Sequence, residues 1–288
     1  MRGIIMMVLF TLLFSPVHFA QAKASPVQNQ PHLSTWFWHT EMIETHPSDV
    51  LSFIKQQQVK TVYLQVNSSI SPQSYQTFIQ NLSKWEVEVH ALDGSPSFSE
   101  EQLANFYTWL TTYQEQAAPN QKFKGVHLDV EPYLHSDWQQ DNPNAILRYQ
   151  EFVIQAKDGA TRLSLPLSLA IPFWFDEFTY SNLYGSGNLA KWIIEQTDAI
   201  SIMAYRDSAD AIIQIVKEEI NWANQLGKKV IIGVETNQTD EPSFITFHEE
   251  GEAYMKDQLT KVALHYQQSP SYAGICIHDL KNWMVMKK

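Results

Sequence analysis

The amino-acid sequence predicts a single (β/α)8 barrel, and three observations support this fold class. From Leu33 onward, short apolar or β-branched runs alternate with longer stretches of helical period, which is the pattern of parallel βα units. Residues 25–288 are close in number to the roughly 250 residues of a typical barrel. The turn at residues 39–42 lacks the glycine-rich phosphate fingerprint of dinucleotide-binding sheets. An open doubly wound sheet is therefore the second choice.

Eight strands are predicted in chain order. Each is a short run of apolar, β-branched or aromatic residues between longer polar stretches. They cover residues 35–38, 61–66, 88–92, 125–130, 164–171, 199–204, 229–234 and 274–277.

Helices are predicted between the strands, most clearly at residues 47–57, 100–116, 144–157, 209–226 and 249–267. Pro47 suits the first turn of a helix, and Gly227 suits the position just after one. Within 209–226 the apolar residues mostly recur every three or four positions, so one face can pack on a sheet. Gly185 and Gly187 predict a loop, and residues 280–288 form a short final segment.

The first residues predict export. Arg2 precedes the apolar run 4–14, and small residues follow at Ala20, Ala22 and Ala24, as in a secretory signal peptide. The apolar run is too short to cross a bilayer of about 30 Å as a helix. We expect a signal peptide at residues 1–24, a barrel domain at 25–288, and a secreted, periplasmic or cell-envelope protein that is not inserted in the membrane after cleavage. An uncleaved anchor is the alternative.

The composition disfavours several classes of function. Thirty-one acidic residues stand against twenty basic ones, and no Lys/Arg run could follow a phosphate backbone, so nucleic acid is not an expected partner. The single cysteine, Cys276, lies in an apolar run and predicts a buried thiol. No spacing typical of a metal site is present, and neither a metal nor a cofactor is expected.

Polar and aromatic residues gather where the predicted strands end. In (β/α)8 enzymes the catalytic groups come from the C-terminal ends of the strands and the loops that follow. Carboxylates and amides can hydrogen-bond sugar hydroxyls, and tryptophan rings can stack on a pyranose, so an oligo- or polysaccharide is the expected partner. The substrate-binding candidates are Trp38, Asn67, Asp93, Trp174, Met203, Asp207 and His278.

The stretch from Phe123 to Tyr133 carries the strongest catalytic pattern. Alternation along a strand puts His127, Asp129 and Glu131 on one face, which in a barrel is the interior leading to its mouth. Two carboxyl groups this close should interact, so one of them should keep its proton to a higher pH. A protonated carboxyl at the mouth is what protonation of a glycosidic oxygen requires. A buried acid pair with a structural role is the alternative.

This stretch resembles the fourth-strand signature of family 18 glycoside hydrolases, the chitinase-like enzymes, D-G-x-D-x-D-x-E. Gly125, Asp129 and Glu131 match the signature, while Lys124 and His127 stand where the family has its first two aspartates. The resemblance implies that Glu131 protonates the leaving group while the acetamide of the substrate attacks the anomeric carbon. It also implies that Asp129 orients this acetamide.

A second stretch, residues 201–207, is similar to the family's sixth-strand pattern M-x-Y-D. Met203 and Tyr205 match, and Arg206 is inserted before Asp207. By position, Tyr205 donates a hydrogen bond to the acetamide. Other hallmarks differ: residues 90–95 replace S-x-G-G on the third strand, and His278 stands where the family usually has tryptophan.

Glu235 supports a rival mechanism. Retaining glycosidases of clan A carry an acid/base glutamate on the fourth strand, often followed by proline, and a nucleophilic glutamate on the seventh, and Glu131, Pro132 and Glu235 are similar to this layout. The asparagine that normally precedes the acid is Val130 here. A carboxyl separation of about 5–5.5 Å would favour a covalent nucleophile, and roughly 6.5–9.5 Å an inverting pair.

The sequence thus predicts an exported glycoside hydrolase that cleaves a glycosidic bond in a polysaccharide, with Glu131 as general acid/base. A polysaccharide that contains N-acetylhexosamine is one candidate substrate. The competing hypothesis is a catalytically inactive, lectin-like barrel that binds a glycan. A direct pairing of Lys124 or Arg206 with Glu131 would favour this binding protein. The sugar, the linkage, endo or exo action and the oligomeric state do not follow from the sequence.

Overall fold

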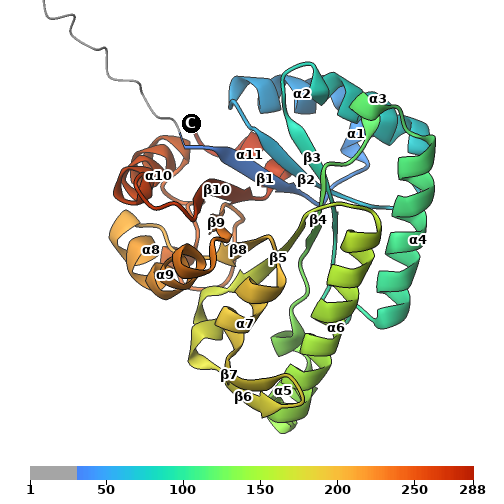
Figure 1. Ribbon diagram of the computed structural model, residues 1–288. Coiled ribbons are helices and arrows are strands. Elements are labelled where there is room, and N and C mark those ends of the chain that lie inside the picture. The colour runs from blue at the N-terminus through green and yellow to red at the C-terminus, as the bar shows by residue number, and fades with distance from the viewer. Residues whose placement is uncertain (1–30) are drawn as a thin grey trace, which may run out of the picture.

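In the computed structural model, eight parallel strands close into a barrel surrounded by helices (Figure 1). The structure describes residues 31–288, so the signal peptide predicted at residues 1–24 lies outside the described residues. Around the barrel the strands follow the order β1, β10, β9, β8, β5, β4, β3, β2. The predicted fold class, a single (β/α)8 barrel, is confirmed.

All eight predicted strands belong to the barrel. Their observed bounds are β1 Leu33–Phe37, β2 Thr61–Gln65, β3 Glu88–Asp93, β4 Gly125–Leu128, β5 Leu167–Pro172, β8 Ala199–Met203, β9 Lys229–Glu235 and β10 Tyr272–His278. The barrel closes between β1 and β10, where the hydroxyl groups of Ser34 and Thr35 donate to the carbonyls of Ile275 and Ile277.

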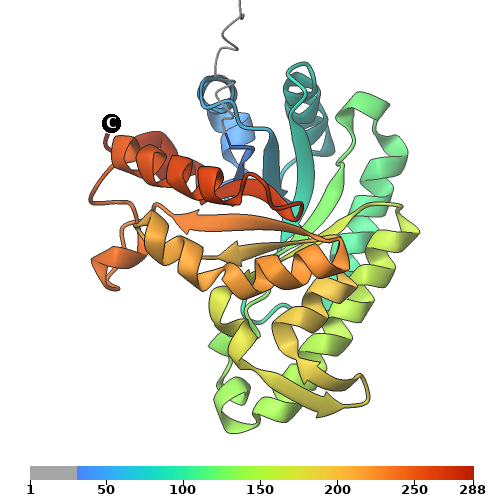
Figure 2. The same ribbon diagram turned by 60° about the vertical axis from the view of Figure 1, so that its left-hand side comes forward.

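Helices connect successive strands and cover the outside of the barrel (Figure 2). They are α1 Met42–Thr45, α2 Pro47–Gln56, α3 Pro72–Ser83, α4 Glu100–Gln116, α5 Ser136–Gln140, α6 Asn142–Arg162, α7 Leu189–Gln196, α8 Ala209–Ile215, α9 Lys217–Leu226, α10 Glu252–Tyr266 and α11 Leu280–Val285. Short 3-10 turns follow at η1 Pro119–Gln121, η2 Pro132–Leu134, η3 Phe173–Glu177 and η4 Ser243–Ile245. No helix within residues 31–288 combines the length and apolar character needed to cross a bilayer.

Several local signals act as expected. Pro47 occupies the first turn of α2, and Gly227 ends α9 in a left-handed conformation with φ 66°, which glycine adopts at little cost. Ser99 caps α4 in a reciprocal box with Gln102. The helix predicted at 209–226 is instead broken at Val216, whose buried side chain lies at the junction of α8 and α9.

The prediction of a loop at Gly185 and Gly187 is wrong. Strands β6 Thr179–Asn182 and β7 Gly185–Asn188 pair as an antiparallel hairpin outside the barrel, near α5 in Figure 1. Asn182 ties this hairpin to α6, because its Nδ2 donates to Oε1 of Gln150 at 2.7 Å. The alternation in residues 179–182 favours a strand; Leu183 and Tyr184 form the turn, and Gly185 follows it at the start of β7 with φ 99°.

Candidate active site

Asp129 and Glu131 lie just beyond the last residue of β4, at the mouth of the barrel. The ladder of hydrogen bonds continues to Asp129, whose backbone N–H donates to the carbonyl of Asp93 at 3.0 Å. The observed strand β4 therefore ends at Leu128, two residues before the end of the predicted strand. Asp129 is buried, and within residues 31–288 its Oδ1 has no hydrogen-bond partner.

This environment keeps Asp129 protonated to an unusually high pH. Burial, and then the nearby carboxyl of Glu131, raise the pKa of its carboxyl from 3.8 to about 7, while His278 acts in the opposite direction. Burial of a charge without a partner favours the neutral form of an acid. One carboxyl of the pair is thus able to hold a proton near neutral pH, as the sequence predicts.

Glu131 is held by Tyr133, a residue that the sequence analysis did not single out. The hydroxyl of Tyr133 donates to Oε2 of Glu131. Burial first, and then the charge of Glu131, raise the pKa of Tyr133 far above its ordinary value, so the phenol remains a donor. Its ring lies 4.7 Å from that of Trp174 and nearly perpendicular to it. The only sequence signal for Tyr133 is its place directly after Glu131-Pro132.

Tyr205 lies two residues beyond the end of β8, near three carboxyl groups of the mouth. Burial raises the pKa of its phenol well above 10, and Glu235, Asp129 and Glu131 contribute in that order. Its ring centroid is 6.1 Å from the ring of His278. Tyr205 is therefore a neutral hydroxyl donor among carboxyl groups.

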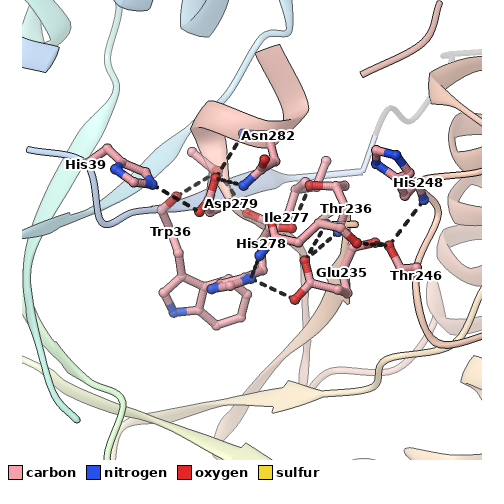
Figure 3. Close-up of polar contacts among 12 residues, drawn as sticks. Trp36, His39, Glu235, Thr236, Thr246, His248, Ile277, His278, Asp279 and Asn282 are labelled. Atoms are coloured by element: carbon pink, nitrogen blue, oxygen red, sulfur yellow. Dashed lines mark hydrogen bonds and ion pairs between the residues drawn. The ribbon is translucent and has the colours of Figure 1, made fainter. Parts of the chain in front are cut away.

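Glu235 and His278 form an ion pair between the ends of β9 and β10 (Figure 3). Nδ1 of His278 lies 2.9 Å from Oε2 of Glu235, and Oε1 accepts the backbone N–H groups of Thr236 and Asn237, each at 2.7 Å. Burial alone would lower the pKa of His278, but the hydrogen bond and charge of Glu235 outweigh it and leave this pKa raised. Both oxygens of Glu235 are thus engaged, and the imidazole tends to carry a positive charge.

The floor below the carboxyl pair is a closed network around His127. Nε2 of His127 accepts the indole N–H of Trp36 at 2.9 Å, and its Nδ1 lies 2.7 Å from the hydroxyl of Ser168. The imidazole also stacks on Tyr63 at 4.0 Å. Burial lowers the pKa of His127 well below 6.5. His127 is neutral and fully engaged, so it cannot replace the missing aspartate as a partner of Asp129.

Three substrate-binding candidates line the mouth with these groups. Trp38 is half-buried over the apolar interior of the barrel, beside the cluster that contains Trp36. Met203 is the last residue of β8 and is buried. Trp174 contacts Tyr133, as described above, and so belongs to the surroundings of Glu131.

Three other candidates are placed differently. Asp93 follows Leu92 of the barrel interior and lies on the outer face of β3, beside a cavity of about 280 Å³ also lined by Trp109; burial raises its pKa to about 6. Oδ1 of Asn67 accepts the N–H of Ser69 and so caps its own loop. Asp207 is bound through its main chain to the carbonyl of Phe244. The structure does not bring these side chains into the Asp129–Glu131 group.

The two cations named in the sequence analysis do not pair with Glu131. Nζ of Lys124 donates to the carbonyl of Pro119 at 3.2 Å, and Nη1 of Arg206 donates to the carbonyl of Tyr205 at 2.7 Å. Asp279 has a structural task, because its carboxylate caps α11 by accepting the N–H of Asn282 (Figure 3). In the part of the chain from residue 31 onward, no cluster of three His, Cys, Asp or Glu side chains is suited to a metal ion.

Comparisons with known proteins agree on the fold. No family model matches the sequence, and no curated protein matches it. A GH18 chitinase from Pseudoalteromonas aurantia superimposes with a TM-score of 0.54 at 13% identity, over 88% of this chain and 98% of that one.

Two further chitinase structures superimpose less closely. One from Cycas revoluta, in complex with (GlcNAc)3, has a TM-score of 0.46 at 12% identity over 88% of this chain and 96% of its own. A catalytic domain from Ostrinia furnacalis, in complex with a chitooligosaccharide, has a TM-score of 0.45 at 13% identity over 72% of this chain, which spans 64% of that domain. At sequence identities this low, structural similarity indicates a shared fold and does not indicate a shared function. The chain therefore shares its (β/α)8 fold with the GH18 chitinase from Pseudoalteromonas aurantia.

Proposed function

We propose that the protein is a glycoside hydrolase that cleaves an N-acetylhexosamine-containing polysaccharide, with Glu131 as the general acid. The observation that carries this proposal is the carboxyl pair at the barrel mouth. Asp129 is buried and its Oδ1 has no hydrogen-bond partner within residues 31–288, and nearby Glu131 accepts a hydrogen bond from Tyr133. An unpaired buried carboxyl is costly for the fold. A ligand that donates to it would offset that cost.

The residues of the mouth divide the chemistry as follows. Glu131 gives its proton to the glycosidic oxygen as the bond to the anomeric carbon breaks. The carbonyl oxygen of the substrate acetamide attacks this carbon, and water later releases the product and restores the proton to Glu131. Oδ1 of Asp129 accepts the acetamide N–H, and Tyr205 donates to the acetamide oxygen; both assignments follow the positions of the family pattern.

We assign Glu235 to the support of His278 and not to nucleophilic attack. Three donors already bind its carboxylate: two backbone N–H groups and the imidazole. A carboxylate stabilised in this way is a weaker nucleophile than a free one. This assignment favours the acetamide-assisted mechanism over the clan A alternative.

The test is hydrolysis of purified polysaccharides with and without N-acetyl groups, by wild type, Glu131→Gln and Glu235→Gln. Wild type should cleave an acetylated glycan, and Glu131→Gln should lose at least about a hundredfold in kcat, the usual range for a general acid. Glu195→Gln, an exposed glutamate on α7, is the matched control and should keep full activity. Equal loss in Glu131→Gln and Glu235→Gln would point to two catalytic carboxylates.

The lectin-like alternative predicts a different result. Under that hypothesis wild type turns over no substrate, and Glu131→Gln binds a glycan as tightly as wild type does. This result would remove Glu131 from catalysis.

We also propose that the protein acts outside the cytoplasm after removal of residues 1–24. The support is the charged start, apolar run and small-residue site of the N-terminal sequence. Sequencing of the N-terminus of the protein recovered from the medium or envelope tests this proposal. A mature protein that still begins at Met1 would contradict it.

A further inference from the structure

Arg206 lies on the rim of the barrel between two loops. It follows Tyr205 directly, just after the end of β8, and β8 runs between β5 and β9 in the barrel (Figure 1). The loop after β5 supplies Phe173, and the loop after β9 supplies Phe244. Arg206 therefore joins three neighbouring connections on the side of the barrel where the carboxyl pair lies.

The guanidinium of Arg206 is clamped between two aromatic rings. Its Cζ is 4.8 Å from the ring centroid of Phe173 and 5.3 Å from that of Phe244, both within the range of a cation–π contact. Its Nη1 donates to the carbonyl of Tyr205 at 2.7 Å. These contacts fix the plane of the guanidinium, and within residues 31–288 its other N–H groups donate to no acceptor.

Within residues 31–288, no carboxylate forms an ion pair with Arg206. Arg148, by contrast, forms an ion pair with Asp137 at 3.0 Å. The adjacent Asp207 shows a raised pKa, mainly because of burial, and Arg206 offsets this burial only in part. In a chain with 31 acidic and 20 basic residues, a half-buried arginine without an acidic partner is conspicuous.

Two neighbouring aromatic residues of the loop after β5 connect Arg206 with the surroundings of the candidate acid. Phe173 stacks on Arg206, and its neighbour Trp174 packs edge-on against Tyr133. Tyr133 in turn donates to Glu131. The oriented cation and the carboxyl pair thus belong to one rim.

We propose that Arg206 is a specificity-determining residue that binds a carboxylate on the glycan. The inference rests on the proposed function and names its substrate class: an N-acetylhexosamine strand whose sugars also carry carboxylate groups. A planar guanidinium with a fixed orientation matches a carboxylate through paired N–H···O bonds. A neutral glycan would leave this charge unsatisfied, and lysine could not reproduce the fork.

The experiment measures binding and is independent of turnover. Glu131→Gln protein is titrated calorimetrically with N-acetylhexosamine oligosaccharides in which every second sugar bears an ether-linked carboxylate. The matched ligand is the same preparation after reduction of the carboxylates to alcohols. We expect the carboxylated ligand to bind about tenfold more tightly, which corresponds to about 1.4 kcal/mol.

Second substitutions in the same background identify the residue responsible. Arg206→Gln should abolish the preference, Arg206→Lys should retain only part of it, and Phe244→Leu, which removes one side of the clamp, should reduce it. Arg148→Gln removes an exposed, ion-paired arginine from α6 and should leave the preference unchanged. Circular dichroism verifies that each variant is folded.

The outcomes separate the two proposals. Equal affinity for both ligands, no binding of either, or a preference that survives Arg206→Gln would overturn the role of Arg206. If wild type hydrolyses neutral N-acetylated glycans through Glu131 without this preference, only the inference fails. If it hydrolyses nothing but binds the carboxylated ligand through Arg206, the hydrolase proposal fails and the anion site stands.

Discussion

The carboxyl of Asp129 couples the protonation of the mouth to the stability of the barrel. Its pKa is about 7 in the folded protein and 3.8 in the reference state, so folding retains a proton between these values. The preference of the folded protein for the protonated carboxyl stabilises the fold fully below about pH 4, and this contribution is lost as pH rises toward 7. The loss amounts to roughly 4 kcal/mol, because each unit between the two pKa values corresponds to about 1.4 kcal/mol.

Asp129→Asn removes this titration and tests it. The variant should become more stable relative to wild type as pH rises from 4 to 7, and the difference should then level off. Urea unfolding of both proteins at pH 4, 5.5, 7 and 8.5 measures the effect. Parallel stability curves for the two proteins would mean that Asp129 is ionised in the folded state.

At the level of single residues, the sequence predicts side chains on regular strands better than those on turns. Strand alternation predicts that Asp129 and Glu131 share a face, and the hydrogen-bond ladder of β4 continues as far as Asp129. Tyr133 acts on Glu131 from a 3-10 turn, where no periodicity indicates direction. Asp93 is a candidate only because it follows a predicted strand. Alternation from Leu92, which faces the barrel interior, places Asp93 on the outer face of β3.

Among the elements, α9 carries a buried acid with no evident task in the site. Glu219 is fully buried, and neither carboxylate oxygen has a hydrogen-bond partner within residues 31–288. Burial raises its pKa to about 8, and Asp176 adds to the effect. Stability from this group is therefore lost as pH rises from about 4.5 to 8.

Glu219→Met replaces the carboxyl by an apolar side chain of similar length and should stabilise the protein above pH 8. A gain of about 1–3 kcal/mol is expected, the usual cost of an unsatisfied buried polar group. Glu218→Met, one position away and exposed, is the control and should change little. Thermal unfolding at pH 5 and 9 decides the matter: no pH-dependent gain would show that Glu219 has a partner in solution.

Whole helices and strands can be predicted where the regular spacing of apolar residues persists over many positions. The strands and the helices α2, α4, α6 and α10 follow from such runs. The break at Val216 does not, because the apolar residues keep their helical spacing across it. The hairpin of β6 and β7 was missed because two glycines within three residues indicate flexibility, whereas pairing along the strands determines the conformation here.

For the whole molecule, the barrel depends on one large side chain in its interior. The ring of Trp36, from β1, reaches Gly233 on β9, where an added Cβ would lie 2.7 Å from the Cη2 atom of Trp36. It would also lie 2.9 Å from the carbonyl oxygen of Ile202 on β8. Glycine is thus required at position 233 by close approach and not by backbone conformation.

Gly233→Ala should destabilise the barrel by about 1–3 kcal/mol, as overpacking of a core does. Gly187→Ala in the hairpin is the control, since its Cβ would meet Tyr180 at 3.5 Å, an ordinary contact. Denaturant titration followed by tryptophan fluorescence measures both. Equal midpoints for Gly233→Ala and wild type would show that Trp36 has room to move aside.

The closed network around His127 limits how protons reach the mouth. Both imidazole nitrogens are engaged and the ring stays neutral, so among residues 31–288 His127 is not expected to pass protons from the far end of the barrel to Asp129. We therefore expect protons to enter and leave by the side from which the proposed glycan comes. A bound glycan would then isolate the carboxyl pair from the pH of the medium, and the protonation state present at the moment of binding would be the one that the chemistry uses.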